Sequence, residues 1–404
     1  MILSCSNISK AFGSEVILEN ISFHIEEHEK AAVVGINGAG KTTLLKIIIG
    51  ELPADSGNVV IARGKTIGYL AQHQDLESSR TIYEEVLEIK RPLIQMEERI
   101  RQLEKEMKHV QGDALESMFS EYSRLNHQFE LENGYAYQSE VIGVLKGLGF
   151  VEDEFEKKVN TLSGGQKTRV SLGRLLLSNP DIILLDEPTN HLDMESIAWL
   201  ENYLLNYKGS VIIVAHDRFF LNRVVKKVIE LDRGHSQVYL GNYDAYSQKR
   251  AMLRQAQMKA YLNQQQEIKH QQEVIAKLKS FNREKSIKRA ESREKMLAKI
   301  EVLDKPTEVN DAMHIILEPR TESGNDVLSI RNLSKSFGPL KLFSHVDMEI
   351  KRGERVAIIG NNGTGKSTLL KIIMDRLPAD TGQIRPGTKV HVGYYDQEQQ
   401  VLHQ

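Results

Sequence analysis

The sequence predicts an α/β protein with three parts: a first domain that contains a helical subdomain, a charged two-helix linker, and the front half of a second copy of the domain. Two observations predict this organisation. The chain repeats itself without gaps, and a strongly basic stretch lies between the copies. With 404 residues, of which 40% are hydrophobic, the chain has enough material for two or three packed domains.

The repeat has a single offset of 325 residues. The segment that starts at Leu3 matches the one that starts at Leu328, and the segment at Gly35 matches the one at Gly360. The second copy stops at Gln404, so we expect it to be incomplete and the chain to be a fragment or truncated product. The predicted boundaries are 1–245 for the first domain, with a helical insertion at about 82–145, then 246–325 for the linker and 326–404 for the second copy.

The formal charge of −2 argues against a uniformly basic nucleic-acid binder, but the charge is unevenly distributed. Residues 84–132 hold 12 acidic and 7 basic side chains, whereas residues 249–305 hold 15 basic and 7 acidic ones. The linker is therefore the basic part of the chain. The single cysteine, Cys5, excludes an intramolecular disulfide and a cysteine-based zinc site, which favours a cytoplasmic protein.

The linker sequence predicts two helices folded back on each other. Tyr261, Ile268 and Ile275 recur every seven residues, and a second apolar pattern runs from Met296 until Pro306 ends it. Residues 280–286 break the pattern and are expected to form the turn. We propose the basic side chains near this turn as RNA contacts, although a solvated charged coiled coil is the competing interpretation: Lys277, Lys279, Arg283, Lys285, Lys288 and Arg289.

A glycine-rich motif of the form G-x-x-x-x-G-K-[ST] occurs in both copies, between an apolar strand and a helix. Such a P-loop wraps backbone N–H groups around phosphate, while its lysine reaches the β- and γ-phosphates and its hydroxyl binds Mg²⁺. The sequence therefore predicts Mg-nucleotide sites. Their residues are Gly35, Asn37, Gly38, Gly40, Lys41, Thr42 and Thr43 in the first copy, and Gly360, Asn362, Gly363, Gly365, Lys366, Ser367 and Thr368 in the second.

Two carboxylates end a predicted buried strand in the first domain. Four apolar residues precede Asp186 and Glu187, as expected for a central strand of a parallel sheet. Asp186 suits the Mg²⁺ shell, and Glu187 suits orienting and deprotonating an attacking water. Another buried strand ends at His216, a candidate contact for the γ-phosphate, although a lone histidine at a strand end is often only a polar cap.

The turn Ser163-Gly164-Gly165-Gln166, placed ahead of the two carboxylates, resembles the signature of ABC-type ATPases. This resemblance implies a P-loop ABC ATPase domain that sandwiches ATP and Mg²⁺ against the signature turn of a second domain. It also assigns Gln72 and Gln397 to the Q-loop and Phe12 and Phe337 to adenine stacking, with core packing as a rival role for the two rings. The implied metal-site residues are Thr42, Gln72, Asp186 and Ser367. Because stacking accepts either purine, the choice between ATP and GTP stays open.

Tandem domains, the runs Asn190–Asp193 and His216–Leu221, and the basic linker together resemble ABC-F proteins. That resemblance implies a partner in the ribosome, at the E site, with the linker directed toward peptidyl-tRNA and the peptidyl-transferase centre. It leaves antibiotic resistance and general translation roles open. The main alternative is the ATP-binding subunit of an ABC transporter with separate membrane partners, since the sequence has no transmembrane run. A repair ATPase or a purely structural module is also conceivable.

The chain has one signature turn and one Asp186–Glu187 pair, so neither composite ATP site is complete within it. We therefore expect an ATPase fold that binds ATP but hydrolyses it poorly as a monomer. Two first domains could complete each other's sites in a homodimer.

Overall fold

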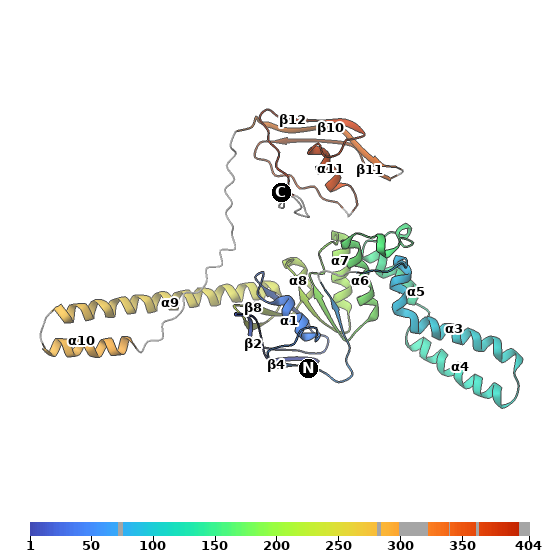
Figure 1. The fold of residues 1–404 in the computed structure, drawn as a ribbon, viewed down its shortest axis with the longest axis horizontal. Coiled ribbons are helices and arrows are strands. Elements are labelled where there is room, and N and C mark those ends of the chain that lie inside the picture. Colours follow the sequence, from blue (N-terminus) through green and yellow to red (C-terminus); the bar gives the residue numbers. More distant parts are fainter. Residues whose placement is uncertain (72–75, 281–283, 299–321, 339, 361–362, 396–404) are drawn as a thin grey trace.

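The computed structural model describes residues 1–71, 76–280, 284–298, 322–338, 340–360 and 363–395. The centre of the first domain is a six-stranded sheet (Figure 1). The P-loop strand and four others run parallel to one another. Its order is β5 (Ile67–Leu70), β6 (Ile182–Asp186), β7 (Ser210–Val214), β3 (Lys30–Gly35), β8 (Lys227–Asp232) and the antiparallel edge strand β9 (His235–Leu240).

The strands β6 and β7 are buried along their whole length, which is why their sequences are uninterrupted apolar runs. One face of the sheet is covered by α1 (Lys41–Ile48) and by a three-stranded antiparallel sheet of β2 (Glu15–Ile25), β1 (Leu3–Phe12) and β4 (Ser56–Ile61). The other face packs against α6 (Gly164–Ser178), α7 (Met194–Asn206) and α8 (Arg218–Val224).

The acidic insertion is helical, as predicted. It contains α2 (Ile82–Leu87), α3 (Arg91–Glu106), α4 (Asp113–Leu131) and α5 (Tyr137–Gly147), with 3-10 turns at Glu88–Lys90 and Met107–His109. Two further 3-10 turns, Glu152–Glu154 and Val159–Thr161, lead to α6. A small apolar cluster that includes Leu93, Ile100 and Phe129 holds α3 and α4 together as a hairpin (Figure 1).

The linker contains a helical hairpin whose two helices differ in length. The first helix, α9 (Tyr243–Ser280), has 38 residues, and α10 (Glu284–Leu297) has 14. Ile275 and Ala290 are buried where the two pack together, in agreement with the predicted repeat. The helix begins at Tyr243, a few residues before the expected linker boundary at 246, because its first turns pack on the domain through Tyr246. The second predicted apolar pattern, which ends at Pro306, lies partly outside the described residues.

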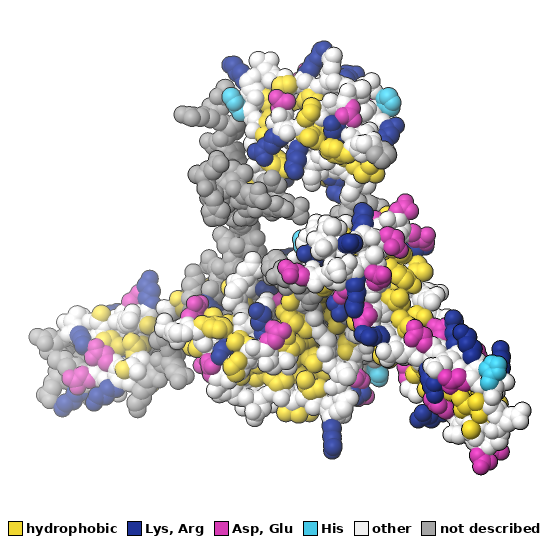
Figure 2. Space-filling model, turned by 45° about the vertical axis from the view of Figure 1, so that its right-hand side comes forward, with side chains coloured by type: hydrophobic (Ala, Val, Ile, Leu, Met, Phe, Trp, Pro, Cys, Tyr) yellow, Lys and Arg dark blue, Asp and Glu magenta, His cyan; other side chains and the backbone are white. Residues whose placement is uncertain are grey.

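The second copy repeats the antiparallel sheet and the P-loop helix of the first. Strands β11 (Leu340–Lys351), β10 (Asp326–Phe337) and β12 (Thr381–Pro386) pack against α11 (Lys366–Ile373). The segment 354–360, which includes the counterparts of all β3 residues, is not a strand. Val356 and Ile359 are 52% and 78% exposed, whereas their counterparts Ala31 and Val34 are buried. Figure 2 shows hydrophobic side chains on the surface of this lobe.

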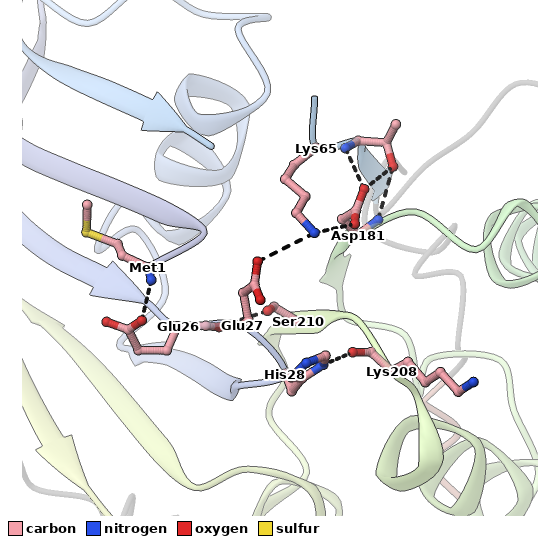
Figure 3. A network of polar contacts seen from close by, with 9 residues as sticks. Met1, Glu26, Glu27, His28, Lys65, Asp181, Lys208 and Ser210 are labelled. Carbon is pink, nitrogen blue, oxygen red and sulfur yellow. Dashed lines mark hydrogen bonds and ion pairs between the residues drawn. The ribbon is translucent and has the colours of Figure 1, made fainter. Parts of the chain in front are cut away.

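Polar contacts hold the amino-terminal ends of parallel strands, on the side of the sheet away from the P-loop (Figure 3). Asp181, directly before β6, accepts hydrogen bonds from the backbone N–H of Thr66 at 2.9 Å and from Lys65 Nζ at 3.0 Å. The hydroxyl of Ser210, at the start of β7, donates to the carbonyl of Glu26 at 2.9 Å. These contacts determine where β6 and β7 begin. They therefore also help to position the functional side chains that follow the carboxyl ends of these strands.

Candidate nucleotide-binding site

The P-loop lies between β3 and α1 with the geometry of a phosphate cradle. Gly38 and Gly40 have φ angles of 84° and 88°, which residues with a Cβ rarely adopt, so glycine is required at both positions. Lys41 opens α1, and its Nζ donates to the carbonyls of Gly35 at 2.9 Å and Ile36 at 3.0 Å. The ammonium group is therefore folded over the loop, next to the free N–H groups at the start of the helix.

The hydroxyl of Thr42 donates a hydrogen bond to Asp186 Oδ2 at 2.8 Å, although 144 residues separate the two in sequence. The sheet order explains this contact, because β3 and β6 are separated only by β7 and end at the same edge. A hydroxyl and a carboxylate side by side are oxygen donors of the kind that Mg²⁺ prefers when phosphate supplies further ligands. The described residues contain no group of three or more acidic, histidine or cysteine side chains that could hold a metal ion.

Glu187 stands at the turn after β6 with a φ of 53°, an uncommon value for a residue with a side chain. Its backbone N–H donates to the carbonyl of Val214 at 2.8 Å, which fixes the turn against β7. The carboxylate accepts the backbone N–H of His216 at 3.3 Å, and Oε1 lies 3.3 Å from the imidazole Nε2 of the same residue. The side chain of Glu187 is buried, and that of His216 is 61% exposed.

Burial governs the electrostatics of the site. Desolvation raises the pKa of both Asp186 and Glu187, although Thr42 and Lys41 oppose the shift at Asp186 and His216 opposes it at Glu187. Desolvation also lowers the pKa of Lys41, against the attraction of the two carboxylates. Burying an unpaired charge in this site has an unfavourable free energy. The site therefore favours a charged ligand that pairs with the lysine and the carboxylates.

These side chains surround a cavity of about 580 Å³, large enough for the phosphates and sugar of a nucleotide. The predicted site residues make up most of its lining but do not include Ile17, Asn190 and Val214. The apolar character of Ile17 and Val214 gives no signal of a binding role. The lining residues are Phe12, Ile17, Asn37, Gly38, Gly40, Lys41, Thr42, Thr43, Asp186, Glu187, Asn190, Val214 and His216.

The two aromatic candidates are not core residues. Phe12 and Phe337 are 51% and 49% exposed, and Phe12 lines the cavity. Core packing, the rival role for these rings, therefore does not describe their position. Both stand at the ends of corresponding strands, β1 and β10.

The turn Ser163–Gln166 is not part of the lining of its own domain's cavity. Ser163 caps α6, with its hydroxyl accepting the N–H of Gln166 while the side chain of Gln166 accepts the N–H of Ser163. Gly165 lies so close to His191 that an added Cβ would come within 2.9 Å of the imidazole. Arg169, on the same helix, is structural: it is buried over the ring of Phe150 and donates to the carbonyl of Leu148.

The second P-loop repeats part of this geometry. Lys366 opens α11 and donates to the carbonyl of Gly360 at 2.7 Å, as Lys41 does to Gly35. Gly363 and Gly365 have φ angles of 84° and 94°, equal or close to those of the first copy. Ser367 and Thr368 follow on the same helix. Three residues predicted for the nucleotide sites lie outside the described residues: Gln72, Asn362 and Gln397.

The linker bases predicted as RNA contacts occupy the far end of the hairpin. Lys277 and Lys288 are exposed, whereas Lys279 pairs with Glu294 at 2.7 Å across the two helices. Arg283 lies outside the described residues, and the side chains of Lys285 and Arg289 are not described. No helix in the described part of the chain combines the length and the apolar character needed to cross a membrane.

Comparisons with known proteins agree with this architecture. A family model described as ABC transporter matches residues 18–190 and 343–404, and a second with the same description matches 229–315. Among the relatives is the protein YdiF of Bacillus subtilis, 43% identical over 403 residues, which cover 100% of this chain and 62% of the relative. A solved structure of the ATP-binding cassette MJ0796 bound to ADP and Pi is 24% identical, with a TM-score of 0.43, over 59% of this chain and 98% of that one.

Two further relatives carry informative names. The ABC transporter F family member 2 of Arabidopsis thaliana is 34% identical over 97% of this chain and 58% of its own length. The ATP-binding protein Uup of Escherichia coli is 32% identical over 97% of this chain and 60% of its own length. The chain thus spans about three fifths of the length of these relatives.

Proposed function

We propose, on the premise that this chain belongs to the ABC ATPase family and within it to the ABC-F proteins, that it binds Mg-ATP at its P-loops and acts on the ribosome in the cytoplasm. The observation that carries the nucleotide part is the hydrogen bond between Thr42 and Asp186, which brings a P-loop hydroxyl and a strand-end carboxylate together beside Lys41.

The site residues divide the chemistry among them. The N–H groups of the P-loop and Lys41 neutralise the phosphates. Thr42 and Asp186 would hold a bound Mg²⁺, which would supply further neutralisation of the phosphate charge. Glu187 orients a water against the terminal phosphate and takes its proton, and His216, 3.3 Å from that carboxylate, contacts the γ-phosphate. The raised pKa of Glu187 makes it a stronger base than an exposed glutamate.

The resemblance to ABC ATPases implies that hydrolysis needs a signature turn from a facing domain, and Ser163–Gln166 does not line its own domain's cavity. The chain contains this turn once and the Asp186–Glu187 pair once. Two first domains facing each other would each present this turn to the other's P-loop, so ATP turnover should depend on their association.

The ribosomal part of the proposal is supported by the linker. A hairpin that projects from the domain and carries exposed lysines at its far end can neutralise RNA phosphates and release counterions (Figure 1). The ABC-F resemblance implies that the hairpin binds rRNA and peptidyl-tRNA. It would do so in translation regulation or in ribosome protection against antibiotics.

Co-sedimentation of the purified chain with ribosomes, with and without Mg-ATP, tests this proposal. Lys277→Gln with Lys288→Gln should reduce the pelleted fraction and flatten its salt dependence while leaving the Kd for ATP unchanged. The matched control, Lys146→Gln with Lys208→Gln, changes the same charge on the first domain and should pellet like the parent chain. ATP binding without any ribosome binding would instead favour the transporter-subunit alternative.

A further inference from the structure

The aromatic rings assigned to base stacking are each held by a lysine and an aspartate that lie outside the phosphate site. In the first copy, Lys10 Nζ lies 5.7 Å from the centroid of the Phe12 ring and 2.7 Å from Asp55 Oδ1. The second carboxylate oxygen of Asp55 accepts the backbone N–H of Ala11 at 2.8 Å. Both carboxylate oxygens therefore bind residues within two positions of the ring, and the carboxylate connects the end of β1 to the start of β4.

The second copy contains the same arrangement at the same offset of 325 residues. Lys335 Nζ lies 5.4 Å from the centroid of Phe337 and 2.7 Å from Asp380 Oδ1, and Oδ2 of Asp380 accepts the backbone N–H of Ser336 at 2.6 Å. The counterpart of β3 is not a strand in the second copy, yet this group has the same contacts in both. The two copies share these residues at the same offset.

The burial of the pair is asymmetric. The side chains of Lys10 and Lys335 are only 11% and 10% exposed, whereas their aspartates are 50% and 41% exposed. The hydrogen bond from each lysine lowers the pKa of its aspartate, which keeps the carboxylate ionised. A lysine that is this well shielded from water interacts more strongly with a ring than an exposed one does.

We propose that Lys10 with Asp55, and Lys335 with Asp380, are positioning residues that hold Phe12 and Phe337 for stacking on the purine base of the nucleotide. Among the described residues, Phe12 lines the nucleotide cavity and Lys10 does not, so the cation supports the ring from outside the cavity. A cation near the ring also draws electron density away from it, which favours stacking against an electron-rich purine. This inference rests on the proposed nucleotide site and adds its base-recognition element.

The test compares two ligands that share the phosphate site but differ in the base. In the full chain with Lys366→Ala, so that the first site dominates, the Kd values for Mg-ATP and for Mg-tripolyphosphate are measured by calorimetry. Lys10→Met should raise the Kd for ATP by about 3-fold to 10-fold and leave that for tripolyphosphate unchanged. Lys10→Arg should restore ATP binding, since a guanidinium can make the same ion pair and ring contact.

A double-mutant cycle with Phe12→Leu identifies the route of the effect. If Lys10 acts through the ring, Lys10→Met with Phe12→Leu should bind ATP no more weakly than Phe12→Leu alone. Lys146→Met, which removes an exposed ion pair with Glu152, is the control for a lost lysine and should leave both Kd values unchanged.

Three results would overturn the inference without affecting the proposed nucleotide site. They are unchanged ATP binding in Lys10→Met, an equal weakening of ATP and tripolyphosphate binding, and additive effects in the double-mutant cycle. If the parent chain binds neither ligand, or if Lys41→Ala changes neither Kd, the proposed function itself fails.

Discussion

The buried carboxylate of Glu230 accepts the phenol hydroxyl of Tyr246 at 2.9 Å, which joins the strand beside the P-loop strand to the first turns of the linker helix. Glu230 pairs in the sheet with Val34, the residue before Gly35 of the P-loop. Tyr239 donates to the same carboxylate at 3.1 Å, and Arg250 Nε lies 2.5 Å from it. The root of α9 is therefore attached to the sheet within one strand of the nucleotide site.

Tyr246→Phe should loosen this attachment without leaving a cavity. Loss of one hydrogen bond to a buried charged acceptor costs about 1–3 kcal/mol, so amide hydrogen exchange in the first turns of α9 should accelerate correspondingly. Exchange measured by mass spectrometry on peptides covering residues 243–255 checks this. Tyr261→Phe, further along the same helix, is the matched control, and equal protection in both variants would contradict the attachment.

The contacts of Asp181 predict an acid-dependent loss of stability. Hydrogen bonds from the backbone of Thr66 and from Lys65 lower the pKa of Asp181 from 3.8 to about 2. A carboxyl whose pKa is lower in the folded chain stabilises the fold above its ordinary pKa, and this contribution is lost as the pH falls from about 4 to about 2.

The Tm of the parent chain should therefore fall more between about pH 5 and about pH 2 than the Tm of Asp181→Asn, measured by differential scanning fluorimetry. Asp153→Asn, at an exposed 3-10 turn, should follow the parent chain. Parallel Tm curves for the parent and Asp181→Asn would show that the network in Figure 3 contributes no pH-dependent stability.

The two copies should differ in backbone protection. Strand β3 is paired on both sides, by β7 and β8, whereas residues 354–360 form no strand and expose Val356 and Ile359. In the 404-residue polypeptide, amides at 355–360 should exchange much faster than those at 30–35, because unpaired amides exchange without opening of the sheet. Comparable protection of the two segments would mean that another surface pairs with the second one.

Glu187→Gln should separate binding from hydrolysis. The amide keeps the size of the side chain but cannot take the proton of water, so turnover should fall by about 10²–10⁴-fold with little change in the Kd for ATP. Phosphate release is measured over a range of chain concentrations, since activity completed in trans rises with the square of concentration. A variant that hydrolyses ATP at the parent rate, or leaves ribosomes faster than the parent, would refute the assigned role.

Local signals in the sequence were sufficient to predict the phosphate site. The P-loop glycines require positive φ, Ser163 is a strong helix cap, and four apolar residues before Asp186 indicate a buried strand. The contact of Thr42 with Asp186 then follows from a parallel sheet whose strands end at one edge. These elements were predictable because each depends on residues adjacent in sequence.

The parts that sequence reasoning missed depend on packing between distant segments. Nothing near Glu230 in the sequence indicates that it accepts a hydrogen bond from Tyr246 on the next helix. Lys10 and Asp55 are ordinary charged residues in isolation. Their recurrence as Lys335 and Asp380 at the repeat offset is the signal that could have found them.

Calorimetric titration of the chain with ATP is the most direct test of whether the first P-loop, with Thr42 and Asp186, is a Mg-ATP site. We expect saturable binding that Mg²⁺ strengthens. Lys41→Ala should weaken it with or without the metal, and Asp186→Asn should weaken it only when Mg²⁺ is present. The titrations use a chain that also carries Lys366→Ala. ATP binding that does not depend on Mg²⁺ and is unaffected by both Lys41→Ala and Asp186→Asn would contradict a Mg-ATP site at the first P-loop.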